Sequence, residues 1–219
     1  MLRVLFSKTG NAVWISHLDT MRLFQRAFKR SGFHLKHTQG FNPRPSVSIA
    51  LPLSVGVESY CELLDFELDD QDVSCSLIME KLNSNLIDGV KVISVYEQGA
   101  KVKYLRYLQC EIDLVYDGGI PEATENEICS LFQRTELWME KKSKNGITSQ
   151  NIIPMIYSLK TVRLNERILR INAVICCQDP SLNPSQLSAA VTKYLPDHSP
   201  DFVKCRRCEL FNSEYKIFR

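Results

Sequence analysis

The order of strand-like and helix-like hydrophobic patterns limits the fold of this chain more than any other feature of its sequence. Over residues 1–98, the patterns predict the order strand, helix, strand, strand, helix, strand. The predicted strands are Leu2–Phe6, Ser46–Leu51, Tyr60–Leu68 and Val90–Tyr96, with a further short strand at Phe33–Thr38, and the predicted helices are His17–Ser31 and Asp72–Leu86. This is the βαββαβ order of a ferredoxin-like unit, in which two helices cover an antiparallel sheet.

The same order is predicted again after a polar connection at Gln98–Lys103. Strands are predicted at Leu105–Tyr116, Glu136–Lys142, Arg167–Cys176 and Phe202–Phe211, helices at Pro121–Arg134 and Asn183–Leu195, a polar connection at Lys141–Asn151, and an extra apolar segment at Ile152–Tyr157. We therefore expect an α+β fold of two tandem ferredoxin-like (βαββαβ) units with antiparallel sheets. The expected domains are residues 1–98 and 104–219.

The charges are distributed unevenly along the chain, although the formal net charge is only +2. Up to Gly56 the only acidic residue is Asp19, against the basic residues Arg3, Lys8, Arg22, Arg26, Lys29, Arg30, Lys36 and Arg44. The next stretch is acidic, with Glu58, Glu62, Asp65, Glu67, Asp69, Asp70 and Asp72. Such an asymmetry points to an anionic partner for the basic N-terminal part.

The first predicted helix is amphipathic. Ser16 is a suitable N-cap residue, and Asp19 three positions later completes an Asp variant of the capping box. At helical spacing, one face is predicted to enter the core and carries His17, Met21, Phe24, Ala27 and Phe28. The opposite face carries Asp19, Arg22, Arg26, Lys29 and Arg30. This face is either an ordinary solvated surface, with an Asp19–Arg22 pair, or part of a binding surface.

The loop after this helix, Thr38–Pro45, favours the binding interpretation. Gly40, Pro43 and Pro45 give it a restricted, exposed backbone, and polar and aromatic side chains lie between them. Such side chains can hold phosphates or contact an unpaired base. The candidate RNA-binding residues are Lys8, Arg22, Arg26, Lys29, Arg30, Gln39, Phe41, Asn42 and Arg44.

Catalytic and metal-binding patterns are weaker. A metal-independent ribonuclease could use a histidine as its general acid or base, and the candidate catalytic residues are His17, Lys8, Ser7 and His37. Cys205 and Cys208 form a CxxC, but a zinc site needs four ligands, and two cysteines at this spacing in a strand face opposite ways. We expect no metal and no cofactor, and we expect the eight cysteines to be reduced thiols.

The stretch from Phe6 to Ser59 resembles a bacterial domain family of unknown function, the radical-SAM-linked domain. The motifs that match are Phe6-Ser7-Lys8 with Gly10, Ile15 to Asp19, Arg26-Ala27 with Arg30 and Gly32, Gln39 to Pro43 with Pro45, and Ala50 to Leu53 with Gly56, Glu58 and Ser59. The C-terminal half resembles the family more loosely, at Ile152–Ile156 and Asn183-Pro184. Because members of the family occur fused to, or encoded beside, B12-binding-type radical SAM proteins, the resemblance implies the same fold and such a protein as partner.

Three functions remain open on this basis. The first is an RNA-binding accessory module that presents tRNA or rRNA to a radical SAM modification enzyme. The second is a metal-independent endoribonuclease or RNA-processing enzyme, and the third is a protein-interaction subunit that docks through the acidic stretch Glu58–Asp72 without touching RNA. The N-terminus is too polar for a signal peptide, and no apolar run reaches the ~20 residues of a membrane helix, so we expect a cytoplasmic protein.

Overall fold

The chain forms two compact units. The computed structural model describes residues 1–69, 72–97, 99–143 and 146–219. Unit 1 contains residues 1–104 together with Arg219, and unit 2 contains residues 105–218. Three sequence expectations fall partly outside the described residues: Asp70 in the acidic stretch, Gln98 at the end of the first expected domain, and positions 144–145 of the polar connection.

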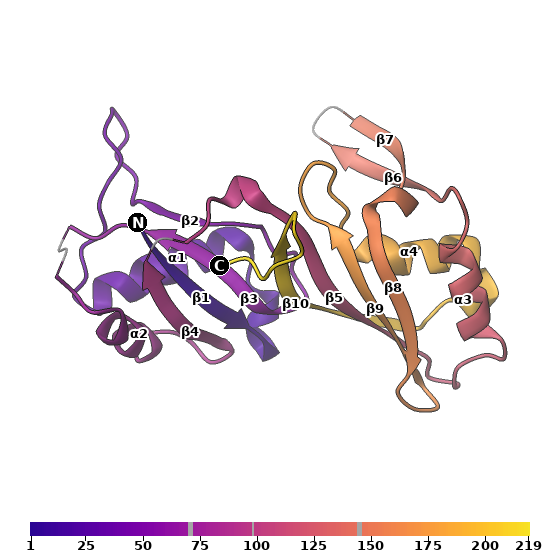
Figure 1. Cartoon of the computed structure of the whole chain (residues 1–219). Helices are drawn as coiled ribbons and strands as arrows, with labels where there is room; N and C mark the ends of the chain where they lie inside the picture. Colours follow the sequence, from indigo (N-terminus) through magenta and orange to yellow (C-terminus); the bar gives the residue numbers. More distant parts are fainter. Residues whose placement is uncertain (70–71, 98, 144–145) are drawn as a thin grey trace. The chain divides into compact units, whose positions relative to one another are not determined.

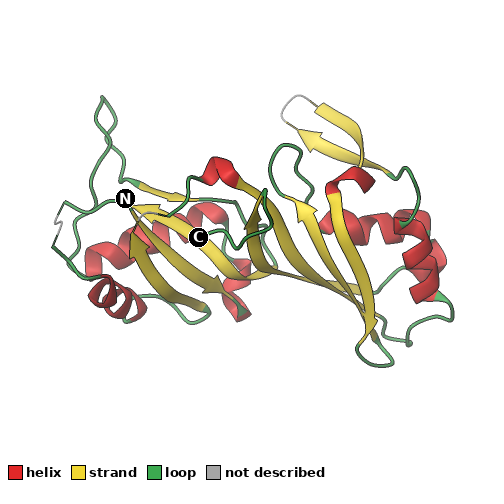
Figure 2. Cartoon of the chain, viewed as in Figure 1, coloured by secondary structure: helices red, strands yellow, loops and turns green. Residues whose placement is uncertain are grey.

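Unit 1 is an antiparallel sheet with two helices. Its strands run in the order β4 (Val90–Glu97), β1 (Leu2–Lys8), β3 (Val57–Phe66), and the short β2 (Val47–Ile49) pairs with β3. The helices are α1 (His17–Arg30) and α2 (Cys75–Asn83), and short 3-10 turns occur at η1 (Gly10–Trp14) and η2 (Val102–Tyr104). Both helices lie against the same face of the sheet (Figures 1 and 2).

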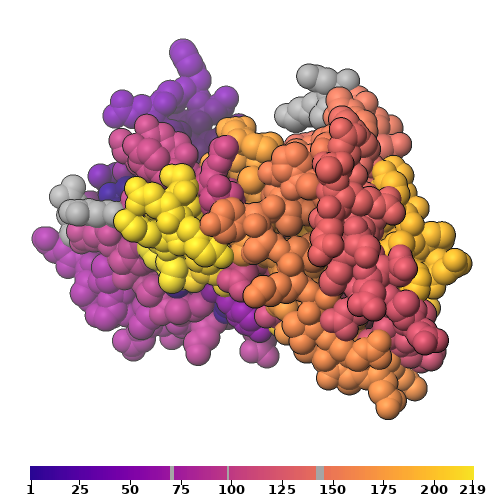
Figure 3. All heavy atoms as spheres, turned by 45° about the vertical axis from the view of Figure 1, so that its right-hand side comes forward, coloured from indigo at the N-terminus to yellow at the C-terminus, as the bar shows by residue number. Residues whose placement is uncertain are grey.

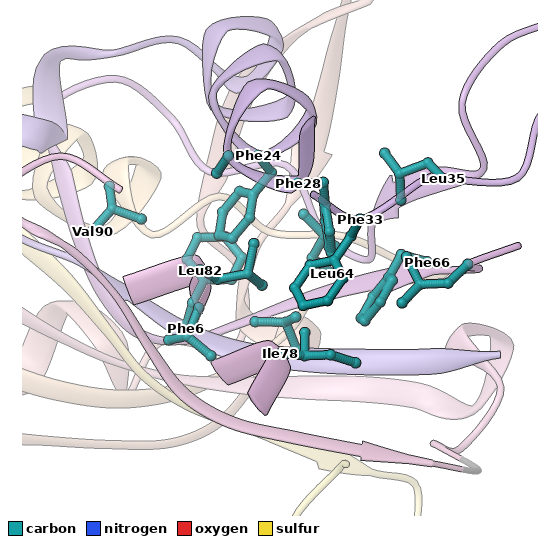
Figure 4. Close-up of a cluster of buried hydrophobic side chains, with 14 of the residues drawn as sticks. Phe6, Phe24, Phe28, Phe33, Leu35, Leu64, Phe66, Ile78, Leu82 and Val90 are labelled. Atoms are coloured by element: carbon teal, nitrogen blue, oxygen red, sulfur yellow. The ribbon is translucent and has the colours of Figure 1, made fainter. Parts of the chain in front are cut away.

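The core of unit 1 lies between that sheet face and the two helices. Phe24 of α1 packs edge-on against Phe6 of β1, and Phe28 packs against Phe66 of β3, each with ring centroids 4.7 Å apart. From α2, the side chains of Ile78 and Leu82 enter this core, so the apolar face of each helix is buried on the sheet (Figure 4). Full burial of large apolar side chains of this kind stabilises a fold by about 1.5–3 kcal/mol each.

The first helix begins and ends as the sequence predicts. The Ser16 hydroxyl accepts the backbone N–H of Asp19 at 3.1 Å and donates to the Asp19 carboxylate at 2.7 Å. The helix ends at Arg30, and Gly32 follows with φ +79°, a left-handed conformation that glycine adopts without strain. Phe24, Ala27 and Phe28 are buried, whereas the predicted charged face is exposed along its whole length.

Unit 2 consists of antiparallel strands and two helices. Its strands run in the order β10 (Phe202–Asn212), β5 (Leu105–Val115), β9 (Ile168–Cys176), β8 (Ile156–Arg163). The helices are α3 (Thr124–Phe132) and α4 (Ser185–Tyr194), with 3-10 turns at η3 (Ile153–Met155) and η4 (Pro196–His198). A separate hairpin is formed by β6 (Trp138–Ser143) and β7 (Gly146–Asn151).

Two strand predictions need correction. The segment Phe33–Thr38 is not a strand, since it forms only isolated bridges from Leu35 to Leu68 and from His37 to Pro45. The predicted strand Glu136–Lys142 lies in the β6–β7 hairpin, and β8 takes the place in the sheet that was expected for it. Pairing within a hairpin closes a short loop at little entropic cost, and alternation in a sequence does not identify the partner strand.

The chain thus has a mixed α+β fold with mostly antiparallel sheet and, in the part of the chain that the structure describes, four α-helices. Among the described residues, the helices include no candidate for a membrane span.

Candidate nucleic-acid interface

The exposed face of α1 carries two cations that no other described residue engages. Arg22 forms an ion pair with Asp19 at 3.0 Å, and Arg30 donates to the backbone carbonyl of Asn85 at 2.6 Å. Hydrogen bonds from Ser16 and Arg22 hold the pKa of the Asp19 carboxyl below its usual value. The side chains of Arg26 and Lys29 make no hydrogen bond or ion pair with any described residue, and both residues are exposed. These two side chains are therefore available to an anion.

Arg26 and Lys29 open onto a groove of about 470 Å3, which we call the α1 groove. Phe33, Leu35 and Pro45 are the apolar part of its lining, and Phe33 and Leu35 are buried. The polar part of the lining is Gln25, Arg26, Lys29, His34, His37 and Asp69. Arg26 also borders a second hollow, of about 290 Å3, on the side of α1 that carries Asp19 and Arg22. Arg26 thus lies between two concave surfaces.

The loop that follows the groove wall projects from unit 1. Its neck is closed by two hydrogen bonds, from Thr38 N–H to Arg44 O at 2.8 Å and from Arg44 N–H to Thr38 Oγ1 at 3.0 Å. The segment between α1 and β2 extends away from the sheet, and it stands out as a narrow column of atoms in the space-filling view (Figures 1 and 3). Gly40 has a φ of +135°, a backbone conformation that residues other than glycine rarely adopt.

The tip of this loop presents its functional groups to solvent. Phe41 is completely exposed, at 106% of its reference area. Gln39, Asn42 and Arg44 are also exposed, and their side chains bond to no other described residue. The turn therefore holds an aromatic ring fully in water beside three polar side chains.

Lys8 is not on this surface, which corrects the expectation that it contacts RNA. It is only 2% exposed, and its ammonium donates to the carbonyl oxygens of Ile15 at 2.7 Å and Val13 at 3.4 Å. Burial lowers the pKa of Lys8, and the nearby Glu62 carboxylate opposes this shift. Lys8 therefore holds the turn before α1 in place.

The candidate catalytic residues are not assembled into one site. Lys8 and His17 line the same cavity, together with Glu62, but its volume of about 10 Å3 is only enough for a water molecule. His37 lines the α1 groove instead, and Ser7 lines neither space. The prediction of a ribonuclease site built from these four residues is therefore not supported by their positions.

The acidic stretch does not form one continuous surface. Glu62 and Asp65 are buried, and the Asp65 carboxylate accepts two hydrogen bonds from the Arg3 guanidinium, at 2.6 and 2.9 Å. Burial tends to lower the pKa of Arg3, but the bonds and charge of Asp65 outweigh it and raise that pKa. Of the acidic residues described here, Asp69 and Asp72 are exposed, and Asp69 lines the α1 groove. The expectation that the whole stretch docks a partner is therefore wrong for its central part.

The environment of the CxxC cysteines disfavours their thiolate forms. Burial raises the pKa of Cys205 to about 12 and that of Cys208 to about 11, so that the thiolate is disfavoured at neutral pH. All eight cysteines are free thiols. The residues described contain no cluster of three or more histidine, cysteine or acidic side chains that could hold a metal ion.

Sequence reasoning missed much of the groove lining, namely Gln25, Phe33, His34, Leu35 and Asp69. Gln25 could have been found, because it lies four positions before Lys29 and so on the same side of the helix. For Asp69 the sequence offers no indication, because its place in the groove depends on backbone pairing across more than thirty residues.

Two solved structures resemble the chain in fold. A Cbf5-Nop10-Gar1 complex contains a chain with a TM-score of 0.52 and 8% identity, covering 95% of this chain and 48% of that one. An H/ACA RNP bound to a substrate RNA contains a chain that matches with a TM-score of 0.50 and 8% identity. This match covers 98% of the present chain and 48% of the chain in the RNP. The chain therefore spans about half the length of these structural relatives.

Comparison of the sequence with known proteins identifies one family. No curated protein matches the chain significantly. Residues 1–184 match the family model described as "Uncharacterized protein conserved in bacteria (DUF2344)". This match includes residues 1–104 of unit 1, with α1, the α1 groove and the projecting loop, and much of unit 2. The chain therefore belongs to this family of bacterial proteins.

Proposed function

We propose that the protein is an RNA-binding accessory module that presents a tRNA or rRNA to a modification enzyme. The observation that carries this proposal is the pair of unengaged cations, Arg26 and Lys29, on the exposed face of α1, beside a projecting loop whose Phe41 is completely exposed. Cations that contact phosphates supply most of the affinity of such interfaces, and exposed aromatic rings stack on unpaired bases.

The residues divide into two roles. Arg22, Arg26, Lys29, Arg30 and Arg44 are proposed to contact phosphates, and Gln39, Phe41 and Asn42 to contact a base or the backbone. Arg26 and Lys29 should contribute most among the helix residues. Arg22 and Arg30 must first give up or share their bonds to Asp19 and Asn85, which reduces what they gain from a phosphate.

The topology supports the fold that this proposal assumes, two tandem ferredoxin-like units. The order β4-β1-β3-β2 in unit 1, with two helices on one face, is the ferredoxin-like order. Unit 2 has the equivalent order β10-β5-β9-β8 when the β6–β7 hairpin is taken as an insertion. This fold serves many functions, so RNA binding rests on the surface residues. The likeness to a chain of an RNP bound to a substrate RNA is consistent with it.

The proposed protein partner is a B12-type radical SAM enzyme, and the proposal places the complex in the cytoplasm. The support is the resemblance of Phe6–Ser59 to the radical-SAM-linked domain. A protein-interaction role without RNA is a weaker alternative, because Glu62 and Asp65 of its expected docking stretch are buried. An endoribonuclease is a weaker alternative, because Lys8 and His17 lie at a cavity too small for a nucleotide.

The test is the salt dependence of RNA binding. Dissociation constants for total tRNA and rRNA are measured from about 50 to 200 mM salt, for the wild type and for the double variant Arg26→Ala/Lys29→Ala. Each lost phosphate contact reduces the slope of log K against log salt by about 0.7–0.9. The double variant Arg163→Ala/Arg167→Ala, which removes two exposed arginines of unit 2, is the matched control.

We expect tight, salt-sensitive binding that selects one RNA, a slope lower by about 1.4–1.8 in the α1 variant, and an unchanged slope in the control. Equal binding by the wild type and the α1 variant would remove the proposal.

A further inference from the structure

We propose that the α1 groove binds one unpaired nucleotide and prefers guanine. The base would lie on the apolar lining of Phe33, Leu35 and Pro45, with Asp69 accepting from its edge, and the phosphate would contact Arg26 and Lys29. The inference rests on the proposed RNA-binding function for its biological context, but the groove can be tested with mononucleotides alone.

The size and lining of the groove suit a nucleotide. Its volume of about 470 Å3 lies within the range of small-molecule sites, about 300–1,000 Å3. Its apolar lining is continuous with the core, since Phe33 and Leu35 are buried, and charged groups lie at its exposed rim. A paired base is covered by its neighbours in the stack, so only an unpaired base can enter a groove of this kind.

The walls of the groove are held in place before any ligand binds. The backbone N–H of Asp69 donates to His34 O at 2.9 Å, and that of Lys36 donates to Glu67 O at 2.9 Å. The bridge between Leu35 and Leu68 lies between these two bonds. The opposite wall is the regular helix α1. A preformed site loses less free energy to ordering on binding than a flexible one.

The preference for guanine follows from the one carboxylate in the lining. Asp69 is exposed, and its side chain engages no other described residue. The edge of guanine carries two adjacent donors, N1–H and the N2 amino group, and a carboxylate can accept both at once. Uracil offers a single N–H between two carbonyl oxygens, which a carboxylate repels. The carboxylate would thus select the base, and the cations would hold any nucleotide.

Two other places among the described residues do not offer such a site. The cavity beside Lys8 and His17 holds only a water molecule. In unit 2, Tyr215 is stacked between Phe211, at 4.4 Å, and Tyr157, at 5.1 Å, so its ring faces are already occupied. The α1 groove combines apolar lining, free cations and a free carboxylate.

The experiment titrates 5′-GMP, 5′-UMP and inorganic phosphate into the full-length protein and follows binding by calorimetry and by NMR. Three variants are compared with the wild type: Asp69→Asn, Arg26→Ala/Lys29→Ala, and the control Asp72→Asn, an exposed acid outside the groove. We expect GMP to bind at least about fivefold more tightly than UMP, the low end of what a bidentate hydrogen-bonded pair contributes.

The variants separate the two roles. Asp69→Asn should remove the preference for GMP, Arg26→Ala/Lys29→Ala should weaken GMP and UMP alike, and Asp72→Asn should change neither. Equal affinities for GMP and UMP, or competition by phosphate as effective as by GMP, would overturn the inference.

The outcome is independent of the test of RNA binding. Salt-sensitive RNA binding that depends on Arg26 and Lys29, without GMP binding, would refute the nucleotide site and leave the proposed function intact. A preference for GMP that Asp69→Asn removes, without binding of any tRNA or rRNA, would refute the proposed function and leave the nucleotide site.

Discussion

Replacing Arg3 by alanine should destabilise unit 1 far more than the same change at Arg22, although both arginines pair with an aspartate. The Arg3 side chain is 1% exposed, and its guanidinium donates to both oxygens of Asp65. A β-carbon on Gly99 would come within 2.7 Å of this guanidinium, which shows how closely the backbone covers it. Arg22 and Asp19 are 66% and 54% exposed.

These environments set the expected magnitudes. Removing one partner of a buried ion pair leaves an uncompensated buried charge and costs about 3–5 kcal/mol. An exposed pair contributes about 0–1 kcal/mol, because water and salt screen it. We therefore expect Arg3→Ala to lower the free energy of unfolding of unit 1 by about 3–5 kcal/mol, and Arg22→Ala to change it by less than about 1 kcal/mol.

The assay is urea unfolding followed by the fluorescence of Trp14, in a Trp138→Phe background so that the signal comes from unit 1. The double variant Arg3→Met/Asp65→Leu is a further check, because apolar replacement of both partners avoids the stranded charge and should recover most of the stability. Equal losses for Arg3→Ala and Arg22→Ala would refute the assignment of Arg3 as a buried structural residue.

Three other predictions test the surface, the buried lysine and unit 2. Phe41→Ala should leave the free energy of unfolding within about 0.5 kcal/mol of the wild-type value but weaken RNA binding by about 1–3 kcal/mol. The control Phe202→Ala, at another exposed phenylalanine, should change neither quantity, and unchanged RNA affinity in Phe41→Ala would exclude stacking by Phe41. Because the folded-state pKa of Lys8 lies below its unfolded value, the unfolded state binds more protons between the two, and stability should rise with pH through that window up to about 10.5. Relative to Lys8→Met, urea unfolding of the wild type should show this rise, and parallel pH profiles would contradict it. Tyr215→Ala removes two stacked ring contacts and should destabilise unit 2 by about 1–3 kcal/mol in thermal unfolding; no change in its melting temperature would show that the stack contributes nothing.

The first helix shows what could be predicted from the sequence. The N-cap at Ser16, the end of the helix before Gly32 and the division into a buried and a charged face all follow from residues within four positions of one another. The order of strands and helices was also largely predicted, because it depends on local periodicity. The exposure of Gln39, Phe41, Asn42 and Arg44 follows from a turn that Gly40 and two prolines enforce locally.

The roles of individual charges could not be predicted in the same way. Arg3 and Lys8 look like Arg26 and Lys29 in the sequence, yet the first two are buried and the last two are free. Whether a basic side chain is buried or exposed depends on which distant segments of the chain pack over it. The partner of Arg3 is Asp65 on a neighbouring strand, and Lys8 lies under the turn that precedes α1.

By itself, the sequence determined the local elements of this protein: the amphipathic helix α1, the projecting loop and most strands, since short-range periodicity and turn residues specify them. Only the tertiary structure decided the α1 groove, because it forms where the chain after α1 pairs with residues 67–69, far along the sequence. It also decided which strand joined the sheet of unit 2, β8 instead of β6. Burial and strand pairing depend on contacts between segments far apart in the sequence. Hydrophobic periodicity predicts that a segment is a strand or a helix, but it does not identify the segment that it packs against.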